Sequence, residues 1–125
     1  MGSVKKKLMA IAMATTMTLV PATVQARTSI DYGKMKITYY CPCEICSEGY
    51  GRKTATPNVY ARSEHTIAVD PDVISLGRHV IIGGKEYVAE DVGGRVCGDH
   101  IDIFVDTHQE TLDGGVKYKK VKVIK

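Results

Sequence analysis

The sequence lacks any hydrophobic run long enough to cross a membrane, and it lacks an excess of positive charge beyond its first residues. Its longest apolar stretch, residues 8–20, falls short of the roughly 20 residues that a transmembrane helix needs. The chain has 17 lysines and arginines against 14 acidic residues, and the difference lies in Lys5, Lys6 and Lys7. We therefore expect neither stable membrane insertion nor nucleic-acid binding.

Residues 1–26 have the three parts of a secretory signal peptide. A basic start at residues 5–7 precedes the apolar stretch, and Val24-Gln25-Ala26 supplies a small-residue cleavage pattern. An uncleaved N-terminal anchor is the alternative. We expect a secreted protein, in which residues 27–35 form a short lead and residues 36–125 form one small domain.

Helical periodicity is scarce, and short alternating segments predominate. Alternation of polar and apolar residues predicts six strands, within residues 34–41, 66–70, 78–82, 85–91, 100–106 and 116–124. Gly83-Gly84 predicts a hairpin turn between two of them. Residues 41–65 have no sustained period and read as a long loop. Six short strands with little helix suggest a small β-barrel.

Two short helical segments complete the pattern. Residues 71–77 predict one turn of helix closed by Gly77, and residues 107–115 predict a short helix. Thr107 and Glu110 have the spacing of a capping box at its start. The C-terminal residues 117–125 hold five lysines, which suggests an edge strand protected by charge. Contact with an anionic cell-wall polymer is the alternative for these lysines.

Asp70, Asp91 and Asp102 lie in or at the ends of predicted strands, where aspartate fits poorly. In a small barrel such positions can gather at one rim. Carboxylates brought together repel one another, so one of them keeps its proton to higher pH. Such a group can protonate the leaving oxygen of a glycosidic bond. The pattern therefore suggests acid–base chemistry on a sugar.

Structural roles compete with catalysis at most of these positions. Asp70 precedes Pro71 and can cap the following turn, since proline suits the first helical position. Asp91 precedes two glycines and can form a turn, and Asp106 can cap the short helix. Asp102 lies inside a strand, where no cap or turn accounts for it.

Four cysteines complete the set of chemically distinctive residues: Cys41, Cys43, Cys46 and Cys97. Export favours disulfides, with one bridge inside the first cluster and one from it to Cys97. A zinc site made of the four thiols is the second interpretation, although the second C-x-x-C of such sites is missing. A catalytic thiol is the third, and connectivity cannot be deduced from sequence.

The histidines share no spacing that predicts a site. They are His65, His79, His100 and His108. His65 is near Asp70 in the sequence and His100 is near Asp102, so either can lie at a groove beside the carboxylates. We expect most of them at the surface, and we assign no catalytic role to His108 in the first turn of the short helix.

Three blocks, "TIAVDPDVISLG", "AEDVGG" and "IDIFVDTHQETLDGG", occur in an order that resembles the 3D (three-aspartate) domain family. That family includes the C-terminal part of membrane-bound lytic transglycosylase A and the stationary-phase survival proteins. The resemblance spans residues 36–124. It implies a mainly β fold, a small six-stranded double-psi β-barrel with one or two short helices.

The resemblance also implies an activity. Asp70, Asp91 and Asp102 correspond to the three aspartates of the family, and Asp102 corresponds to the favoured catalytic acid/base. The implied reaction is non-hydrolytic cleavage of the MurNAc–GlcNAc bond of peptidoglycan, with a 1,6-anhydro product. The expected partners are peptidoglycan glycan strands, and we expect a cell-wall-associated monomer that needs no cofactor and no metal.

Further residues are expected in substrate binding. Thr54 and Thr56 match the groove-lining segment of the family, although Pro57 follows where glycine is common. Gly93 and Gly94 would let the backbone approach the sugar, and Tyr40 would supply a stacking or hydroxyl contact. A non-catalytic wall-binding module of the expansin type is the alternative function. A thiol or metal protein built on residues 41–46 is a third.

Overall fold

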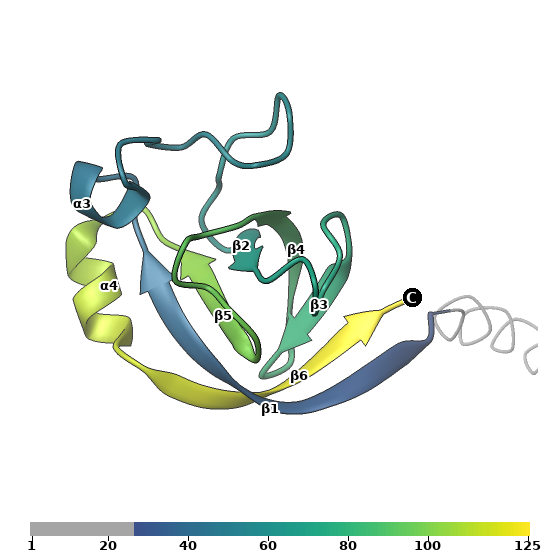
Figure 1. Cartoon of the computed structure of the whole chain (residues 1–125). Helices are drawn as coiled ribbons and strands as arrows, with labels where there is room; N and C mark the ends of the chain where they lie inside the picture. Colours follow the sequence, from purple (N-terminus) through teal and green to yellow (C-terminus); the bar gives the residue numbers. More distant parts are fainter. Residues whose placement is uncertain (1–26) are drawn as a thin grey trace, which may run out of the picture.

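The structure, a computed structural model, describes residues 27–125, and its six strands close into a ring (Figure 1). The predicted signal peptide, residues 1–26, lies outside the described residues. In chain order the elements are β1 (Ser29–Tyr40), α3 (Glu44–Ser47), β2 (Thr66–Val69), β3 (His79–Ile82), β4 (Lys85–Asp91), β5 (His100–Phe104), α4 (His108–Gly114) and β6 (Lys117–Ile124). Around the ring the strands follow the order β1-β5-β2-β4-β3-β6.

The interior of the ring is filled by aliphatic side chains from every strand. Because successive side chains of a strand point to opposite faces, alternate residues reach the core. The buried set comprises Met35, Ile37, Ile67, Val69, Val80, Ile82, Ala89, Ile101, Ile103, Val121 and Val123. The alternation that predicted the strands therefore also predicted the core.

Strand pairing brings distant parts of the sequence together. β1 pairs with β5 in parallel, and β2 pairs with β4 in parallel, while the other neighbours are antiparallel. Asp102 of β5 is the register partner of Thr38 on one side and of Ala68 on the other. Ala68 is in turn the partner of Asp91 of β4. Two of the predicted acidic residues thus flank the same position of β2.

The predicted six strands and the short helix near residue 108 are confirmed. The capping box of Thr107 and Glu110 is present at the start of α4. Gly83 and Gly84, both with positive φ, form the hairpin between β3 and β4. After β2 the amides of Val73 and Ile74 both donate to the Asp70 carbonyl at 2.9 Å, so residues 71–77 begin with the single helical turn that was predicted, and no regular helix continues from it.

The N-terminal lead and the long loop differ from expectation. β1 begins at Ser29, within the predicted lead of residues 27–35, because its first residues pair with the end of β6. α3 lies inside residues 41–65, which were expected to be loop throughout. A four-residue helix offers too little periodicity to be predicted from sequence.

The interpretation of β6 as an edge strand is wrong. β6 is hydrogen-bonded to β1 on one side and to β3 on the other, so it has no free edge. Its Val121 and Val123 point into the core, while alternate lysines face outward. The alternation that suggested a charged edge therefore reflects the outer face of a closed ring.

α3 and α4 lie side by side beyond the C-terminal end of β1 (Figure 1). α4 is packed closely on β1, because a Cβ atom added at Gly114 would come within 2.3 Å of the Tyr39 ring. Both ends of the described chain meet, since the Lys125 amide donates to the Thr28 carbonyl at 3.0 Å. Within residues 27–125, no helix has the length and apolar character that a membrane crossing requires.

Candidate functional site

A groove of about 820 Å³ lies on the outer face of the ring. Its floor comes from β1, β5, β2 and β4, on the side opposite the aliphatic core. The strand residues that line it are Tyr39, Tyr40, Ala68, Asp91 and Asp102. One wall is formed by residues of the 45–55 segment, and the other by residues 92–96. The two walls come from loops that the strand order brings to the same face.

Asp102 is half-buried in the groove floor. Its carboxylate accepts a hydrogen bond from Thr38 Oγ1 at 3.0 Å. Burial raises the pKa of Asp102, the hydrogen bond from Thr38 and the charge of His100 oppose that rise, and the negative charge of Asp91 adds to it. A carboxyl that holds its proton above the usual range can act as a general acid.

Thr38 links Asp102 to His100. The Thr38 hydroxyl lies 2.7 Å from His100 Nε2, and His100 Nδ1 lies 3.1 Å from the Arg95 carbonyl oxygen. A carbonyl oxygen only accepts, so Nδ1 carries a proton in this contact. Two arrangements with the same total number of protons fit the hydrogen bonds among these three residues. In one, a cationic His100 lies beside an Asp102 carboxylate; in the other, a neutral His100 lies beside a protonated Asp102. The Thr38 hydroxyl therefore connects the two side chains by hydrogen bonds.

Asp91 is held by several donors. Its carboxylate accepts hydrogen bonds from Tyr40 Oη at 2.8 Å, from the Ala55 amide at 3.0 Å and from the Val92 amide at 2.9 Å. These contacts join β1, the loop wall and the end of β4. Burial, together with the charge of Asp91 beside it, raises the pKa of Tyr40 far above its usual range, so the phenol stays a donor. Asp91 therefore organises the groove as an anion.

A β-bulge turns Asp91 toward the groove. The register of β2 against β4 advances from Ile67–Ala89 to Ala68–Asp91, so Glu90 is the extra residue. A bulge of this kind re-aims the next side chain. Asp91 and Asp102 then lie on strands either side of β2, with Cα atoms separated by two strand spacings, about 10 Å.

The expectation that three carboxylates gather is wrong for Asp70. Its carboxylate accepts hydrogen bonds from the Gly98 amide at 2.8 Å and the Asp72 amide at 2.9 Å, and it does not line the groove. Those two backbone donors lower the pKa of Asp70. Asp70 thus holds the turn after β2 against the loop before β5, which agrees with the structural role weighed for it above.

The predicted substrate-binding residues fall into two groups. Thr54, Gly93, Gly94 and Tyr40 line the groove. Thr56 does not; its hydroxyl donates to the Glu90 carbonyl at 2.7 Å and fastens the loop wall to β4. The Tyr40 ring is buried in edge-on contact with Phe104, so only its hydroxyl is directed to Asp91. Stacking of a sugar on the Tyr40 ring is therefore not available.

The groove also contains residues that the sequence did not single out. Lys53 and Arg95 line its two walls and bring positive charge to it. Thr38 was not singled out either; it joins Asp102 of the groove floor to His100, which the sequence had placed near Asp102. The outward alternation of Thr38 with Tyr40 was visible in the sequence, but the parallel β1–β5 register that sets Thr38 beside Asp102 was not.

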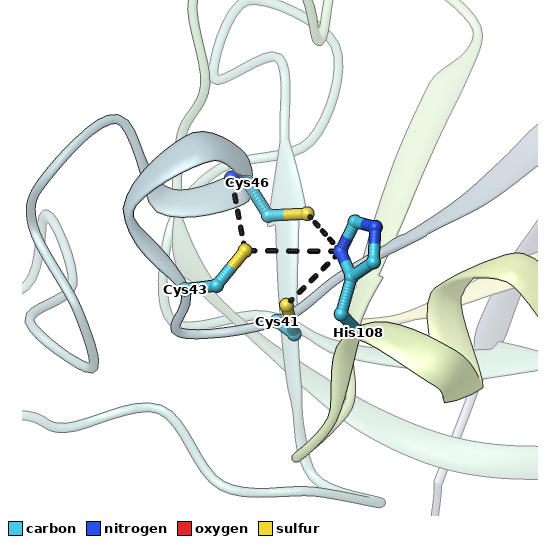
Figure 2. A group of neighbouring side chains, drawn as sticks. All are labelled: Cys41, Cys43, Cys46 and His108. Carbon is cyan, nitrogen blue, oxygen red and sulfur yellow. Dashed lines mark hydrogen bonds between the residues drawn. The ribbon is translucent and has the colours of Figure 1, made fainter.

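The predicted disulfides are absent from the described residues, where all four cysteines are free thiols. Cys97 is exposed on the loop before β5, and its sulfur lies 3.9 Å from the Gly94 carbonyl oxygen. Cys41, Cys43 and Cys46 instead converge on His108 of α4 (Figure 2). The predicted bridge to Cys97 fails because the fourth neighbour of the cluster is an imidazole.

Comparison with known proteins identifies a family over the second half of the chain. The family model described as "3D domain" matches residues 65–125, which include all three aspartates. Residues 65–125 of the chain are therefore a 3D domain.

Two curated relatives are longer than this chain and match only part of it or of themselves. The chain is 46% identical over 59 residues to the cell wall-binding protein YocH of Bacillus subtilis (strain 168), a match that covers 46% of this chain and 21% of YocH. It is 32% identical over 108 residues to the putative cell wall shaping protein YabE of the same organism, covering 82% of this chain and 26% of YabE. The chain thus spans about a quarter or less of the length of these relatives.

The fold has a solved counterpart. The crystal structure of MltA from E. coli aligns with a TM-score of 0.50 and 23% identity, over 61% of this chain and 28% of MltA. This likeness extends to the fold: a mainly β, six-stranded sheet closed in a ring with few short helices.

Proposed function

We propose that this protein is an exported, wall-associated lytic transglycosylase that cleaves the MurNAc–GlcNAc bond of peptidoglycan. The observation that carries the proposal is Asp102: a half-buried carboxyl of raised pKa, in the floor of a groove of about 820 Å³. The acidic group, the open groove and the 3D domain of residues 65–125 support the same chemistry. We also propose that the ring is a double-psi β-barrel, as the family implies, and that the protein is a monomer.

The reaction needs one carboxyl group. Protonated Asp102 donates its proton to the glycosidic oxygen as the bond to C1 of MurNAc breaks. The resulting Asp102 carboxylate takes the proton of the MurNAc C6 hydroxyl while that oxygen bonds to C1. The 1,6-anhydro ring closes, the GlcNAc end leaves as an alcohol, and Asp102 ends the cycle protonated. Water takes no part.

Neighbouring residues support this cycle. The chain from Asp102 through Thr38 to His100 keeps one proton available and stabilises Asp102 when it is ionised. Asp91 raises the pKa of Asp102 by its charge and fixes the groove wall through the Ala55 amide. Asp70 acts at a distance, as a positioning residue for the loop that ends at Gly98.

The test compares wild-type chain, Asp102→Asn and Asp99→Asn on purified peptidoglycan, with soluble products analysed by mass spectrometry. Asp99→Asn is the matched control, since this exposed side chain lies three residues away on the adjoining loop. We expect anhydro-muropeptides from wild type and Asp99→Asn, and at least about a 100-fold loss with Asp102→Asn. Full activity of Asp102→Asn would refute the role of Asp102.

A non-catalytic wall-binding module is the second candidate, favoured by the similarity to a relative named as a cell wall-binding protein. In that case the same groove would hold a glycan strand without cleaving it. The chain would then sediment with insoluble walls and release no soluble product. Asp102→Asn would sediment as well as wild type.

A further inference from the structure

Cys41, Cys43, Cys46 and His108 form a second chemical centre outside the carboxylate groove floor. Their three sulfur atoms and His108 Nδ1 all lie within 4.8 Å of one another and point toward a common centre (Figure 2). Cys41 follows β1 directly, Cys43 caps the start of α3, Cys46 lies within α3, and His108 opens α4. Residues more than 60 positions apart in the sequence therefore supply one compact group.

The distances have the size of a tetrahedral metal site. His108 Nδ1 lies 3.4 Å from the Cys46 sulfur and 3.8 Å from the sulfurs of Cys41 and Cys43. Zinc bonds of about 2.3 Å to sulfur and 2.0–2.1 Å to nitrogen, at tetrahedral angles, require a sulfur–nitrogen separation of about 3.6 Å. The observed separations lie on either side of that value.

Hydrogen bonding alone does not account for this group. An imidazole Nδ1 has either one lone pair or one proton, so it makes one good hydrogen bond, whereas three sulfurs surround it here. Disulfides do not account for it either, because three thiols pair in twos and leave one over. A metal ion uses all four groups at once.

We propose that Cys41, Cys43, Cys46 and His108 bind a structural zinc ion. Three soft thiolates and one imidazole are a zinc donor set. Four protein ligands leave no open position for substrate, which indicates a structural rather than a catalytic ion. The Cys46 amide donates to the Cys43 sulfur at 3.4 Å, a contact that orients a ligand before the metal arrives.

The ion would fix one wall of the glycan groove. Ile45, Cys46 and the residues up to Ala55 line that wall, while α4 is packed on β1 through Gly114 and Tyr39. Zinc would join the start of the 45–55 wall to α4 and so to the ring. Closing such a long loop through a metal removes conformational freedom from the unfolded chain and stabilises the folded one.

Zinc content of the full chain tests this inference without any cell wall present. The variants are Cys46→Ser, His108→Ala and, as the matched control, Cys97→Ser, which alters an exposed thiol outside the cluster. We expect about one zinc per chain in wild type and Cys97→Ser, and less than about 0.1 in the other two after dialysis against a weak chelator. No stoichiometric zinc in wild type, or equal loss in Cys97→Ser, would overturn the site.

Cobalt substitution and a thiol count test the zinc site independently on the same samples. Co²⁺ in the wild-type chain should show thiolate-to-metal charge-transfer absorption and tetrahedral visible bands, both weakened in His108→Ala. A thiol assay on zinc-free wild type under denaturing conditions should find every cysteine reduced. Mass spectrometric detection of a disulfide among Cys41, Cys43 and Cys46 in the native protein would contradict the site. These readings are independent of whether peptidoglycan is cleaved.

Discussion

At the scale of single residues, the groove depends on what surrounds two aspartates. Asp91 accepts three hydrogen bonds, two of them from backbone amides, and is satisfied as an anion. Asp102 accepts a single hydrogen bond, from Thr38, and its burial raises its pKa. Similar side chains on strands either side of β2 thus acquire different roles from their environments.

Asp102→Asn should stabilise the protein while it removes activity. Burial raises the pKa of Asp102 in the folded chain, so between the unfolded and folded pKa values the folded state binds more protons. The free energy of unfolding therefore falls as pH rises through the folded pKa. An amide has no charge to bury, and we expect about 0.5–2 kcal/mol more stability at pH 7.

Urea unfolding of both chains at pH 3 and pH 7 measures this effect. The gain of Asp102→Asn should be present at pH 7 and small at pH 3, where wild-type Asp102 is protonated in both states. A variant less stable than wild type at pH 7 would show that the Asp102 carboxylate is not penalised by burial.

Thr38→Val should slow cleavage without loss of the fold, because valine keeps the shape of threonine and removes the hydroxyl between Asp102 and His100. A lost hydrogen bond to a charged group, about 1.5–3 kcal/mol, corresponds to roughly a 10- to 100-fold lower kcat. Thr38→Ser restores the hydroxyl and should recover most of the rate. The pH–rate profile of Thr38→Val should also shift, which a purely structural role would not produce.

At the scale of elements, three features place the site: the parallel β1–β5 register, the bulge at Glu90 and the packing of α4 on β1. Local alternation predicted the strands, the hairpin and the capping box, because those depend on neighbours in sequence. It could not predict that Thr38 and Asp102 would be partners across 64 positions. It also gave no sign of the bulge, since one extra residue leaves the composition of β4 unchanged.

Gly114→Ala should destabilise the protein through α4. The added methyl group would meet the Tyr39 ring at 2.3 Å, so helix or ring must move. We expect a loss of about 1–3 kcal/mol in the free energy of unfolding. Because His108 opens α4, zinc affinity should fall as well.

Gly94→Ala is the control for this substitution. A Cβ atom at Gly94 meets nothing within 4 Å, so stability should be unchanged within about 0.5 kcal/mol. Gly94 lines the groove, however, so the same variant tests whether backbone there lies against the glycan. Chemical unfolding and sedimentation with walls separate the two effects. Equal destabilisation by Gly94→Ala and Gly114→Ala would contradict the contact with Tyr39.

At the scale of the whole molecule, a closed ring of strands has no free edge, and the groove combines strand residues of its outer face with two walls made of loops. From the sequence, disulfides ranked above metal because export favours disulfides and a second C-x-x-C is missing. Cys97 was taken as the fourth member of the cysteine group, and only the fold brings His108 to that place. The acidic trio was likewise reduced to a pair, because Asp70 faces the loop that ends at Gly98.

Substitutions in the wall and in the floor of the groove should have different effects on binding to cell walls. Loss of zinc, as in Cys46→Ser, should weaken binding to insoluble walls several-fold, because residues 45–55 lose their attachment to α4. Asp102→Asn should leave that binding unchanged. Sedimentation with purified walls, at fixed protein and salt, measures both. Equal binding by wild type and Cys46→Ser would show that the groove wall does not need the ion.

Digestion of purified peptidoglycan in water enriched in ¹⁸O tests the central claim most directly. If Asp102 transfers the C6 hydroxyl proton and closes a ring, the products end in 1,6-anhydro-MurNAc and contain no ¹⁸O at the cleaved linkage. Products with a reducing end labelled by ¹⁸O would show that water attacks and that the chain is a hydrolase. An absence of soluble products, with full retention on the walls, would show that it binds peptidoglycan without cleaving it.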